Sequence, residues 1–514
     1  MAKKLSILLI ATFLSLLLVA NHAVANKEVE ATKEVEANNA EAKIELVTNN
    51  PEAINENEQR HRQTRLREAR QCRLQSISAS QPSRSIQSEG GVTEFWDEFE
   101  DQFQCTGVAA MRNTIQPNSL SLPNYSPSPR LVYIEQGRGL LGITFPGCPD
   151  TYHSSRGGQS ERGSEDRSEE HEGRRRRSDQ HQKVHRVRRG HLVAIPAGVA
   201  HWCLNDGNEE LVAVSVSDLN NQANQLDQKL RSYYLAGGRN HESQRGPQRR
   251  QQQGETYQNI FRAFDENLMA EALNVPVETV RKMQREDKRG YIVRVREDMS
   301  VIRPDEYKED DEREESREGG HRYGQREGRS NGLEETVCTA RIHHYMDNPR
   351  EADVYSRHAG RLNLVNKLKL PILSYLDLSA EKGKLLPNAI HAPHWTMNAH
   401  SIVYVTRGEA HVEVVGNNGE RLLDDKVRQG DIFNVPQYFA STARAGRNGF
   451  EWVAFKTSAM PIKNSLVGST SVFRAMPAQV LAESYGLRIQ EAHNLKFGRE
   501  QHTVLLPPSR SSSN

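Results

Sequence analysis

An Asn-Gly pair lies at the end of a long charged segment, where it could be a site of proteolysis. Asn331 and Gly332 close a stretch at about 304–331 that is rich in Arg, Glu and Gly and lacks apolar periodicity. An exposed, flexible peptide bond of this kind is open to a protease. Cys338 follows seven residues after Asn331, so a disulfide from it could keep two products joined. In such a cut chain we expect the disulfide alone to hold the halves. Asn-Gly is also an ordinary turn dipeptide, and it is the whole string at 331–338 (NGLEETVC) that favours processing.

The N-terminus predicts an oxidising compartment for these cysteines. Residues 1–4 are basic, residues 5–20 are mostly apolar, and Ala23-Val24-Ala25 offers a small-residue cleavage site. This order is typical of a secretory signal peptide over 1–25. The apolar run falls short of the roughly 20 residues needed to span a bilayer, so we expect no membrane anchor. The five cysteines, at positions 72, 105, 148, 203 and 338, then fit two disulfides and one leftover thiol. Spacing alone leaves the pairing open.

Charge and composition exclude some partners. The 514 residues carry a formal net charge of +1, which gives no reason to expect nucleic acid as a partner. From Gly332 onward the chain has 21 Lys and Arg against 17 Asp and Glu, so a cut after Asn331 would separate an acidic from a basic polypeptide. Arg outnumbers Lys by 50 to 18 and is interleaved with Glu, Gln, Ser and Gly in the loops. This pattern indicates selection for nitrogen content more than a shaped binding surface.

The elements that position these residues occur twice. Residues 131–137 parallel 402–408, residues 190–196 parallel 430–436, and residues 211–214 parallel 452–455; Phe-Arg-Ala recurs at 261–263 and 473–475. Four matched segments in one order indicate two copies of one domain. The matched runs are β-branched and aromatic and are bounded by Gly, Pro and Asn, which is typical of antiparallel strands in a sandwich or barrel.

Other segments divide the copies. Charged stretches at about 152–186, 238–256 and 304–331 cannot bury enough apolar surface to order themselves. The first of them is an insertion into a hairpin of the first copy. Residues 218–237, 258–287 and 475–495 have the spacing of helices. Each copy is therefore predicted to be a β-barrel with a helical appendage.

Five residues of the first copy indicate the type of barrel. Gly190, Pro196, Gly198, His201 and Asn205 fit the pattern G-x5-P-x-G-x2-H-x3-N, which resembles the second motif of the cupin superfamily, a small jelly-roll barrel. The resemblance implies a mainly β fold with two cupin jelly-roll barrels, a bicupin, each with a small α-helical extension. Cupin enzymes hold a metal with two His and a Glu from a first motif and one His from the second. Residues two apart on a strand face the same side, so His-x-His presents two imidazoles to one ion.

The metal ligands of that pattern are missing from both copies. Counting back from Gly137 places the Glu position at Arg130 and the His pair at Pro123 and Tyr125, so only His201 remains. Arg130 would repel a metal ion if it pointed inward.

Counting back from Gly408 in the second copy gives the same result. The Glu position falls at Ser401, the His pair at His394 and Thr396, and the second-motif His at Ser441. His201 and His394 are therefore vestigial cupin positions with packing or hydrogen-bonding roles, and His391 could at most assist a surface metal. We predict no catalytic residues, no metal and no cofactor.

A secreted two-cupin chain with these strings resembles the 11S seed storage globulins of the legumin type. The sharpest matches are the string at 331–338, residues 145–149 (FPGCP) and residues 104–109 (QCTGVA). The resemblance implies that Cys148 pairs with Cys338 between the chains and that Cys72 pairs with Cys105 inside the acidic chain. Cys203 is then the free thiol, a small buried hydrophobe.

The resemblance also implies the processing and assembly of the protein. A vacuolar asparaginyl endopeptidase would cut after Asn331; the precursor would form trimers in the endoplasmic reticulum and the cut protein hexamers in seed protein storage vacuoles. Germination proteases would later release its nitrogen and carbon, and several relatives are allergens. The expected organisation is a signal peptide (1–25), an acidic disordered extension or pro-segment (26–70), an acidic chain with the first barrel (71–303), a charged loop (304–331) and a basic chain with the second barrel (332–514).

Two other functions are compatible with the barrels. The first is a metal-dependent bicupin oxidoreductase of the oxalate-degrading type. The second is a cupin that binds a carbohydrate or hormone, for which the sequence offers no positive sign. Nutrient storage is the function that the lost ligands and the nitrogen-rich loops favour.

Overall fold

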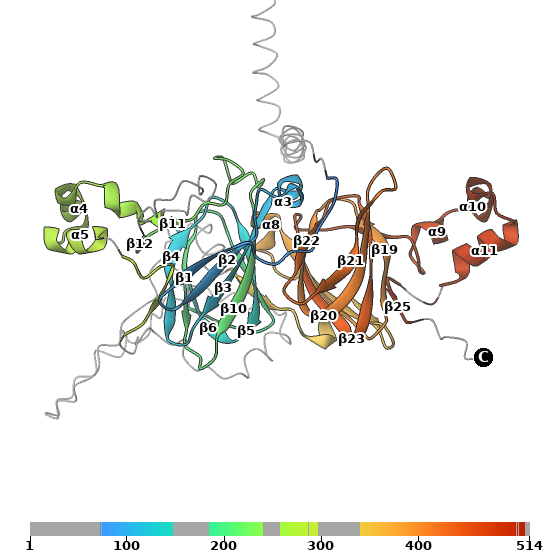
Figure 1. Ribbon diagram of the computed structural model, residues 1–514, viewed down its shortest axis with the longest axis horizontal. Helices are drawn as coiled ribbons and strands as arrows, with labels where there is room; N and C mark the ends of the chain where they lie inside the picture. The colour runs from blue at the N-terminus through green and yellow to red at the C-terminus, as the bar shows by residue number, and fades with distance from the viewer. Residues whose placement is uncertain are drawn as a thin grey trace, which may run out of the picture. The chain divides into compact units, whose positions relative to one another are not determined.

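Two antiparallel β-barrels form the main part of the chain in the computed structural model (Figure 1). The structure describes residues 72, 74–146, 184–239, 257–285, 287–296, 340–499, 501 and 503–508. In Figure 1 the N-terminal barrel runs from blue to green and the C-terminal barrel from yellow to red-orange. The described residues all belong to one structural unit that begins at Cys72. The prediction of a mainly β chain with two barrels and helical extensions is confirmed.

The N-terminal barrel consists of two sheets. Alternation of buried and part-exposed residues along β2 shows how one face of each strand meets the core. The first sheet has the order β1 (Arg84–Ser88), β2 (Gly91–Phe95), β3 (Val108–Ile115), β10 (Leu211–Asp218), β5 (Arg130–Gln136), β8 (His191–Ile195), β15 (His343–Tyr345). The second has the order β11 (Tyr233–Tyr234), β4 (Ser119–Tyr125), β9 (Ala200–Asn205), β6 (Arg138–Thr144), β7 (His185–Arg188), with β14 (Ile292–Arg294) also beside β4.

The C-terminal barrel is built around two long strands. β20 (Ser401–Val415) and β23 (Ala440–Lys456) pair along most of their lengths, with register shifts near Thr406 and Glu409. The main path has the order β16 (Val354–Ser356), β17 (Gly360–Val365), β18 (Ser379–Leu385), β23, β19 (Ile390–Thr396), β24 (Lys463–Ser465). The remaining strands are β21 (Arg421–Arg428) and β22 (Ile432–Val435), both beside β20, and β25 (Leu505–Leu506), beside β19.

The helices lie largely where the sequence predicts them, with one exception. Residues 258–287 hold η2 (Ile260–Ala263), α4 (Glu266–Leu273) and α5 (Val277–Gln284), next to the short pair β12 (Gly238–Arg239) and β13 (Tyr257–Gln258). The C-terminal extension holds α9 (Val472–Ala475), α10 (Ala478–Tyr485) and α11 (Ile489–Phe497). Three short elements connect the strands: α3 (Asp101–Thr106), η3 (Pro349–Glu351) and α8 (Leu373–Leu376).

The helix predicted over 218–237 is wrong. The segment forms turns and the short strand β11. The side chain of Asn221 accepts a hydrogen bond from the backbone N–H of Ala223, and that of Asn224 accepts one from Leu226. Asn side chains that bond the backbone in this way compete with helical hydrogen bonds, so the chain turns here despite its apolar spacing.

Strand pairing confirms the repeat and corrects one of its matches. Leu131 to Tyr133 pair with β8 as Ile402 to Tyr404 pair with β22, as the first two matches predict. The third match is wrong by two residues, because Val214 pairs with Tyr133 while Val453 pairs with Tyr404. Side chains alternate with a period of two along a strand. A shift of the alignment by two residues therefore keeps the same apolar pattern, and the sequence alone does not reveal it.

Segments from either side of Asn331 exchange between the barrels. β15 lies beyond the predicted cut but pairs with β8 of the N-terminal barrel, through His343 to Tyr345. In the other direction, the backbone of Ile77 donates to Leu422, and Ser80 bridges to Ile432 of the C-terminal barrel. The expectation that a disulfide alone would hold the halves is therefore wrong, since backbone hydrogen bonds also join them.

The barrels share a buried contact. One core cluster contains Tyr133 and Leu131 together with Tyr404 and Val453. The hydroxyl of Tyr404 donates to the Glu135 carboxylate over 2.7 Å. In the same contact the ammonium of Lys382 donates to the Tyr133 hydroxyl over 3.0 Å. Buried polar groups paired in this way fix how the two barrels dock.

Candidate functional site

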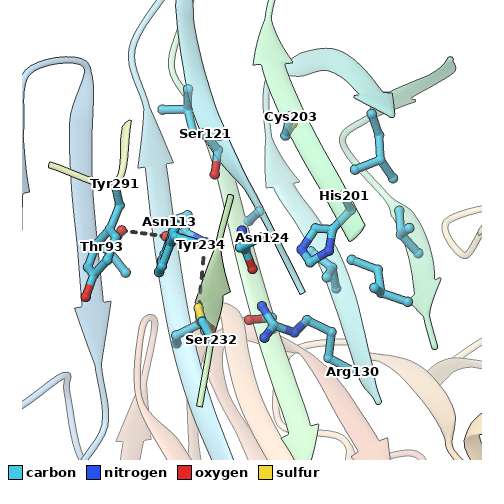
Figure 2. Close-up of a pocket in the computed structure, with 18 of the residues that line it drawn as sticks. Thr93, Asn113, Ser121, Asn124, Arg130, His201, Cys203, Ser232, Tyr234 and Tyr291 are labelled. Atoms are coloured by element: carbon cyan, nitrogen blue, oxygen red, sulfur yellow. Dashed lines mark hydrogen bonds between the residues drawn. The ribbon is translucent and has the colours of Figure 1, made fainter. Parts of the chain in front are cut away.

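The interior of the N-terminal barrel contains a cavity of about 390 Å³. Its walls come from both sheets and from Tyr234 and Tyr291, which stack at a ring-centroid distance of 4.8 Å (Figure 2). Apolar side chains such as Phe95 and Leu141 alternate on these walls with polar ones. The polar lining on the barrel strands includes Thr93, Asn113, Ser121, Asn124, Arg130, His201 and Ser215. The cavity occupies the place where a cupin enzyme would hold its metal.

Strand β4 presents other residues to this cavity than the motif spacing selects. Ser121 and Asn124 line the cavity, whereas Pro123 and Tyr125 do not. The pairing of β4 with β9 shifts its register between Ser121 and Asn124, which turns residues three apart toward the same side. Proline is tolerated inside strands mainly at such irregularities. Tyr125 stacks instead on Tyr233 at 5.1 Å.

His201 is buried in the cavity wall as a neutral imidazole. Its Nδ1 lies 3.3 Å from the carbonyl oxygen of Val199. Burial, together with the nearby charge of Arg130, lowers the pKa of His201 to about 3. Arg130 comes from the facing sheet and points into the same space (Figure 2). The one cupin ligand that the first copy retains thus faces a guanidinium.

Cys203 carries a free thiol on the same wall. The residue is half-buried and packs against the main core cluster. Burial, together with the nearby charge of Asp206, raises the pKa of its thiol to about 12. The thiolate is the reactive form of cysteine, so this thiol is chemically inert at neutral pH.

The C-terminal barrel contains a charged network in the equivalent place. A smaller cavity of about 50 Å³ is lined by Glu381, His391, His394 and Lys456, among others. The ammonium of Lys463 donates to Glu381 over 2.8 Å and lies 3.4 Å from Nε2 of His391. Burial alone would raise the pKa of Glu381, but Lys463 and Lys456 hold it at about 2. Burial lowers the pKa of Lys456 to about 8.

Sequence reasoning missed most of this network. His391 is 6% exposed and its ring lies 4.2 Å from that of His394, centroid to centroid, at a tilt of 34°, so the possibility that it assists a surface metal is wrong. The register of β19 shifts between these two histidines, around Pro393, as that of β4 shifts around Pro123. A proline within a strand-like run was the signal that residues three apart would share a face.

The donor sets of the two interiors do not fit a divalent metal. None of the described residues that line the first cavity is Asp or Glu, and Arg130 faces it. In the second interior the carboxylate of Glu381 is already paired with an ammonium. A cluster of possible ligands does exist outside the barrel interiors, at His411, Glu413 and Asp424, but it is at least partly exposed and Arg421 pairs with Asp424.

Comparison with known proteins identifies the family of the chain. The cupin family model matches residues 77–238 and again 344–493. Over 448 residues the chain is 54% identical to 11S globulin seed storage protein 2 of Sesamum indicum, which covers 87% of this chain and 94% of that protein.

The chain belongs to the 11S seed storage globulins.

Further relatives support the same family membership. An 11S globulin seed storage protein of Carya illinoinensis is 43% identical and covers 86% of this chain and 92% of that protein. The crystal structure of the coconut allergen cocosin matches with a TM-score of 0.71 at 38% identity, covering 85% of this chain and all of that chain. The predicted bicupin fold and the seed storage role of this 11S globulin are confirmed. Among its described helices, none has the length and apolar character needed to cross a membrane.

The cysteines of this 11S globulin are described in part. A disulfide joins Cys72 to Cys105 with a Cα–Cα distance of 4.5 Å, and it ties the start of the described chain to α3. The predicted interchain pair, Cys148 and Cys338, lies outside the described residues, as do the signal peptide, the 26–70 extension and the 304–331 loop. The predicted processing bond after Asn331 also lies there.

Proposed function

We propose that this 11S globulin is made as a single-chain precursor and cut between Asn331 and Gly332 into an acidic and a basic chain. Cys148 and Cys338 would join the two. The string at 331–338 is the observation that carries the proposal. A structural match to recombinant pro-11S globulin of pumpkin supports it, with 37% identity, a TM-score of 0.70 and coverage of 86% of this chain and all of that one.

The surroundings of other Asn-Gly pairs support cleavage at this one. The chain contains two more, Asn418-Gly419 and Asn448-Gly449. The first lies in the turn between β20 and β21, where the N–H of Gly419 donates to Gly416, and the second lies inside β23. Peptide bonds held by turns and ladders resist proteases, because cleavage requires local opening. An asparaginyl endopeptidase should therefore select Asn331.

We further propose that the protein stores amino acids without catalysing a reaction. The described residues that line the two barrel interiors offer no set of ligands for a divalent metal, which argues against the oxalate-degrading alternative, and we propose no cofactor. Relatives named as storage globulins support the same conclusion. Deposition would follow the secretory route through the endoplasmic reticulum to protein storage vacuoles of seeds. Degradation at germination would then release nitrogen and carbon.

Self-association through the helical extensions fits the exposed apolar side chains. Leu268 in α4 is 58% exposed, and Ile489 in α11 is 47% exposed. Single exposed apolar residues are common, but both extensions of the chain carry several. Two different patches that contact each other between copies form a heterologous interface, which closes into a ring such as a trimer. Movement of the 304–331 loop after cleavage would then let two trimers stack as a hexamer.

Replacing Asn331 by Gln is expected to stop both processing and hexamer formation. Glutamine keeps the amide, but its side chain is one methylene longer than that of the asparagine that the protease selects. Precursors are incubated with purified asparaginyl endopeptidase, run on reducing gels and sedimented. The variant should remain one band and sediment as a trimer, whereas Asn418→Gln, the matched control, should be cut to give a small chain that begins at Gly332. Hexamers of intact Asn331→Gln would contradict the link between cleavage and assembly.

Reduction of the cleaved protein is expected to leave its two chains together in native buffer. β15 of the basic chain forms backbone hydrogen bonds with β8 of the acidic chain, and one core cluster spans both. Size-exclusion chromatography with dithiothreitol should therefore show one particle, while a denaturing gel of the same sample shows two bands. Separation of the chains by reductant alone would mean that the exchanged strands contribute little.

A further inference from the structure

We propose that the cavity of the N-terminal barrel binds a small organic monocarboxylate, whose carboxylate pairs with Arg130 and whose apolar part packs inside the barrel. This binding site lies in the acidic-chain barrel and goes beyond nutrient storage. It does not depend on cleavage at Asn331.

The first observation is the state of the Arg130 side chain. Arg130 is 5% exposed, and its Nε and Nη2 have no hydrogen-bond partner among the described residues. Asp or Glu is absent from the described lining of the cavity. A buried charge without a counter-charge is expensive, and the fold normally supplies a partner or removes the charge. Burial accordingly lowers the pKa of Arg130, and a bound anion would reverse this effect.

In the second barrel, the buried charges of the interior are neutralised by a side chain of the same barrel. Met111 of β3 and Glu381 of β18 occupy equivalent positions in the two barrels. Met111 pairs with a residue of β10, Glu381 pairs with a residue of β23, and those two partner residues are equivalent in the repeat. Glu381 supplies the carboxylate that pairs with Lys463. The first barrel has the apolar Met111 at the position equivalent to Glu381. It therefore has a buried cation, Arg130, but lacks the carboxylate that would pair with a cation at that position. Its cavity is also larger, at about 390 Å³ against about 50 Å³.

The cavity limits the chemistry of the ligand. Pockets of about 300 Å³ and more are typical of small-molecule sites, and their walls are mostly apolar with a few polar groups that set orientation. Phe95, Leu141 and Val193 give such an apolar wall, and Asn124 and His201 lie on the side of Arg130 (Figure 2). His201 is neutral, and Arg231, the other arginine of the described lining, forms an ion pair with Asp227, so Arg130 is the lining cation that lacks a counter-charge among the described residues. A monocarboxylate with an aromatic or alkyl body matches this arrangement, since guanidinium binds carboxylate through two parallel hydrogen bonds.

The experiment measures binding of benzoate, cinnamate and octanoate to the full-length protein by isothermal titration calorimetry. Benzamide serves as a neutral partner of the same shape as benzoate. Replacing Arg130 by Met should weaken the best carboxylate by about 10- to 100-fold, the usual contribution of hydrogen bonds to a charged group. Arg130→Lys, which keeps the charge but loses the planar fork, should give an intermediate loss. Arg138→Met, at an exposed arginine of the same barrel outside the cavity lining, is the matched control and should bind as the parent does.

Three outcomes would overturn the proposal. They are the absence of binding for all three carboxylates, equal binding of benzamide and benzoate, and unchanged affinity in a folded Arg130→Lys protein. Equal stabilisation by chloride or inorganic phosphate in a thermal-shift assay would also overturn it, because the site would then hold a simple anion. Far-ultraviolet circular dichroism shows whether each variant is folded, and Arg130→Lys keeps the test valid if Arg130→Met is not.

Discussion

Replacing Glu381 by Gln is expected to lower the free energy of unfolding by about 3–5 kcal/mol, the usual cost of breaking a buried ion pair from one side. The side chain of Glu381 is 7% exposed, that of Lys463 is 17% exposed, and their charged atoms lie 2.8 Å apart. Lys456 lies in the same interior and is 3% exposed. A neutral amide at 381 would leave two ammonium groups in a buried site with no anion.

The measurement is urea unfolding followed by tryptophan fluorescence, because Trp452 lines the same small cavity. The matched control is Glu409→Gln, which breaks an ion pair with Lys426 of similar length, 2.7 Å, but with side chains that are 37% and 61% exposed. Exposed pairs contribute at most about 1 kcal/mol, so the control should shift the midpoint little. The double variant Glu381→Gln with Lys463→Met should recover part of the loss. Equal effects of Glu381→Gln and Glu409→Gln would show that the buried network is solvated.

The buried network also shows what the sequence can and cannot predict. Glu381 and Lys463 are 82 residues apart in the sequence. They come together because β18 lies beside β23, β23 lies beside β19, and β19 lies beside β24 in one sheet. In the sequence they are ordinary charged residues of the kind that usually faces solvent. Strand β18 is buried on both faces along nearly all of its length, so alternation of polar and apolar residues could not indicate which side chain points inward.

Local sequence patterns predicted the structure better than patterns that depend on residues far apart in the sequence. Gly137, directly after β5, has φ +78°, and the matching Gly408, inside β20, has φ +75°, so the repeated glycine reflects a backbone conformation that favours glycine at both positions. The two strand irregularities could have been predicted from Pro123 and Pro393. The pairing of β15 with β8 could not, because three residues carry no measurable periodicity and their partner lies about 150 residues earlier.

Acidification is expected to destabilise the protein steeply between pH 6.5 and about 4. Burial is the first cause of a lowered pKa at seven of the described histidines. The pKa falls to about 3 for His191, His201 and His394 and to about 4 for His343 and His400, and it is also lowered for His344 and His391. In the unfolded chain these groups titrate near pH 6.5. A pKa that is lower in the folded state means that unfolding takes up protons, so the stabilisation is complete above pH 6.5 and is lost as the pH falls. Glu381, with a pKa of about 2, acts in the same direction below pH 4.5.

The expected loss at pH 5 is about 2 kcal/mol for each buried histidine, relative to neutral pH. Urea midpoints measured from pH 7.5 to 4.5 give the slope, and each such histidine should add close to one proton taken up on unfolding. His400→Gln should reduce that uptake by about one proton, because glutamine can accept the N–H of Gln437 that Nδ1 of His400 accepts over 3.1 Å. His358→Gln, at an exposed histidine, should leave the slope unchanged. A flat stability profile between pH 7 and 5 would mean that the buried imidazoles gain protons without opening the barrels, and acid would then not assist the proteases that degrade the stored protein.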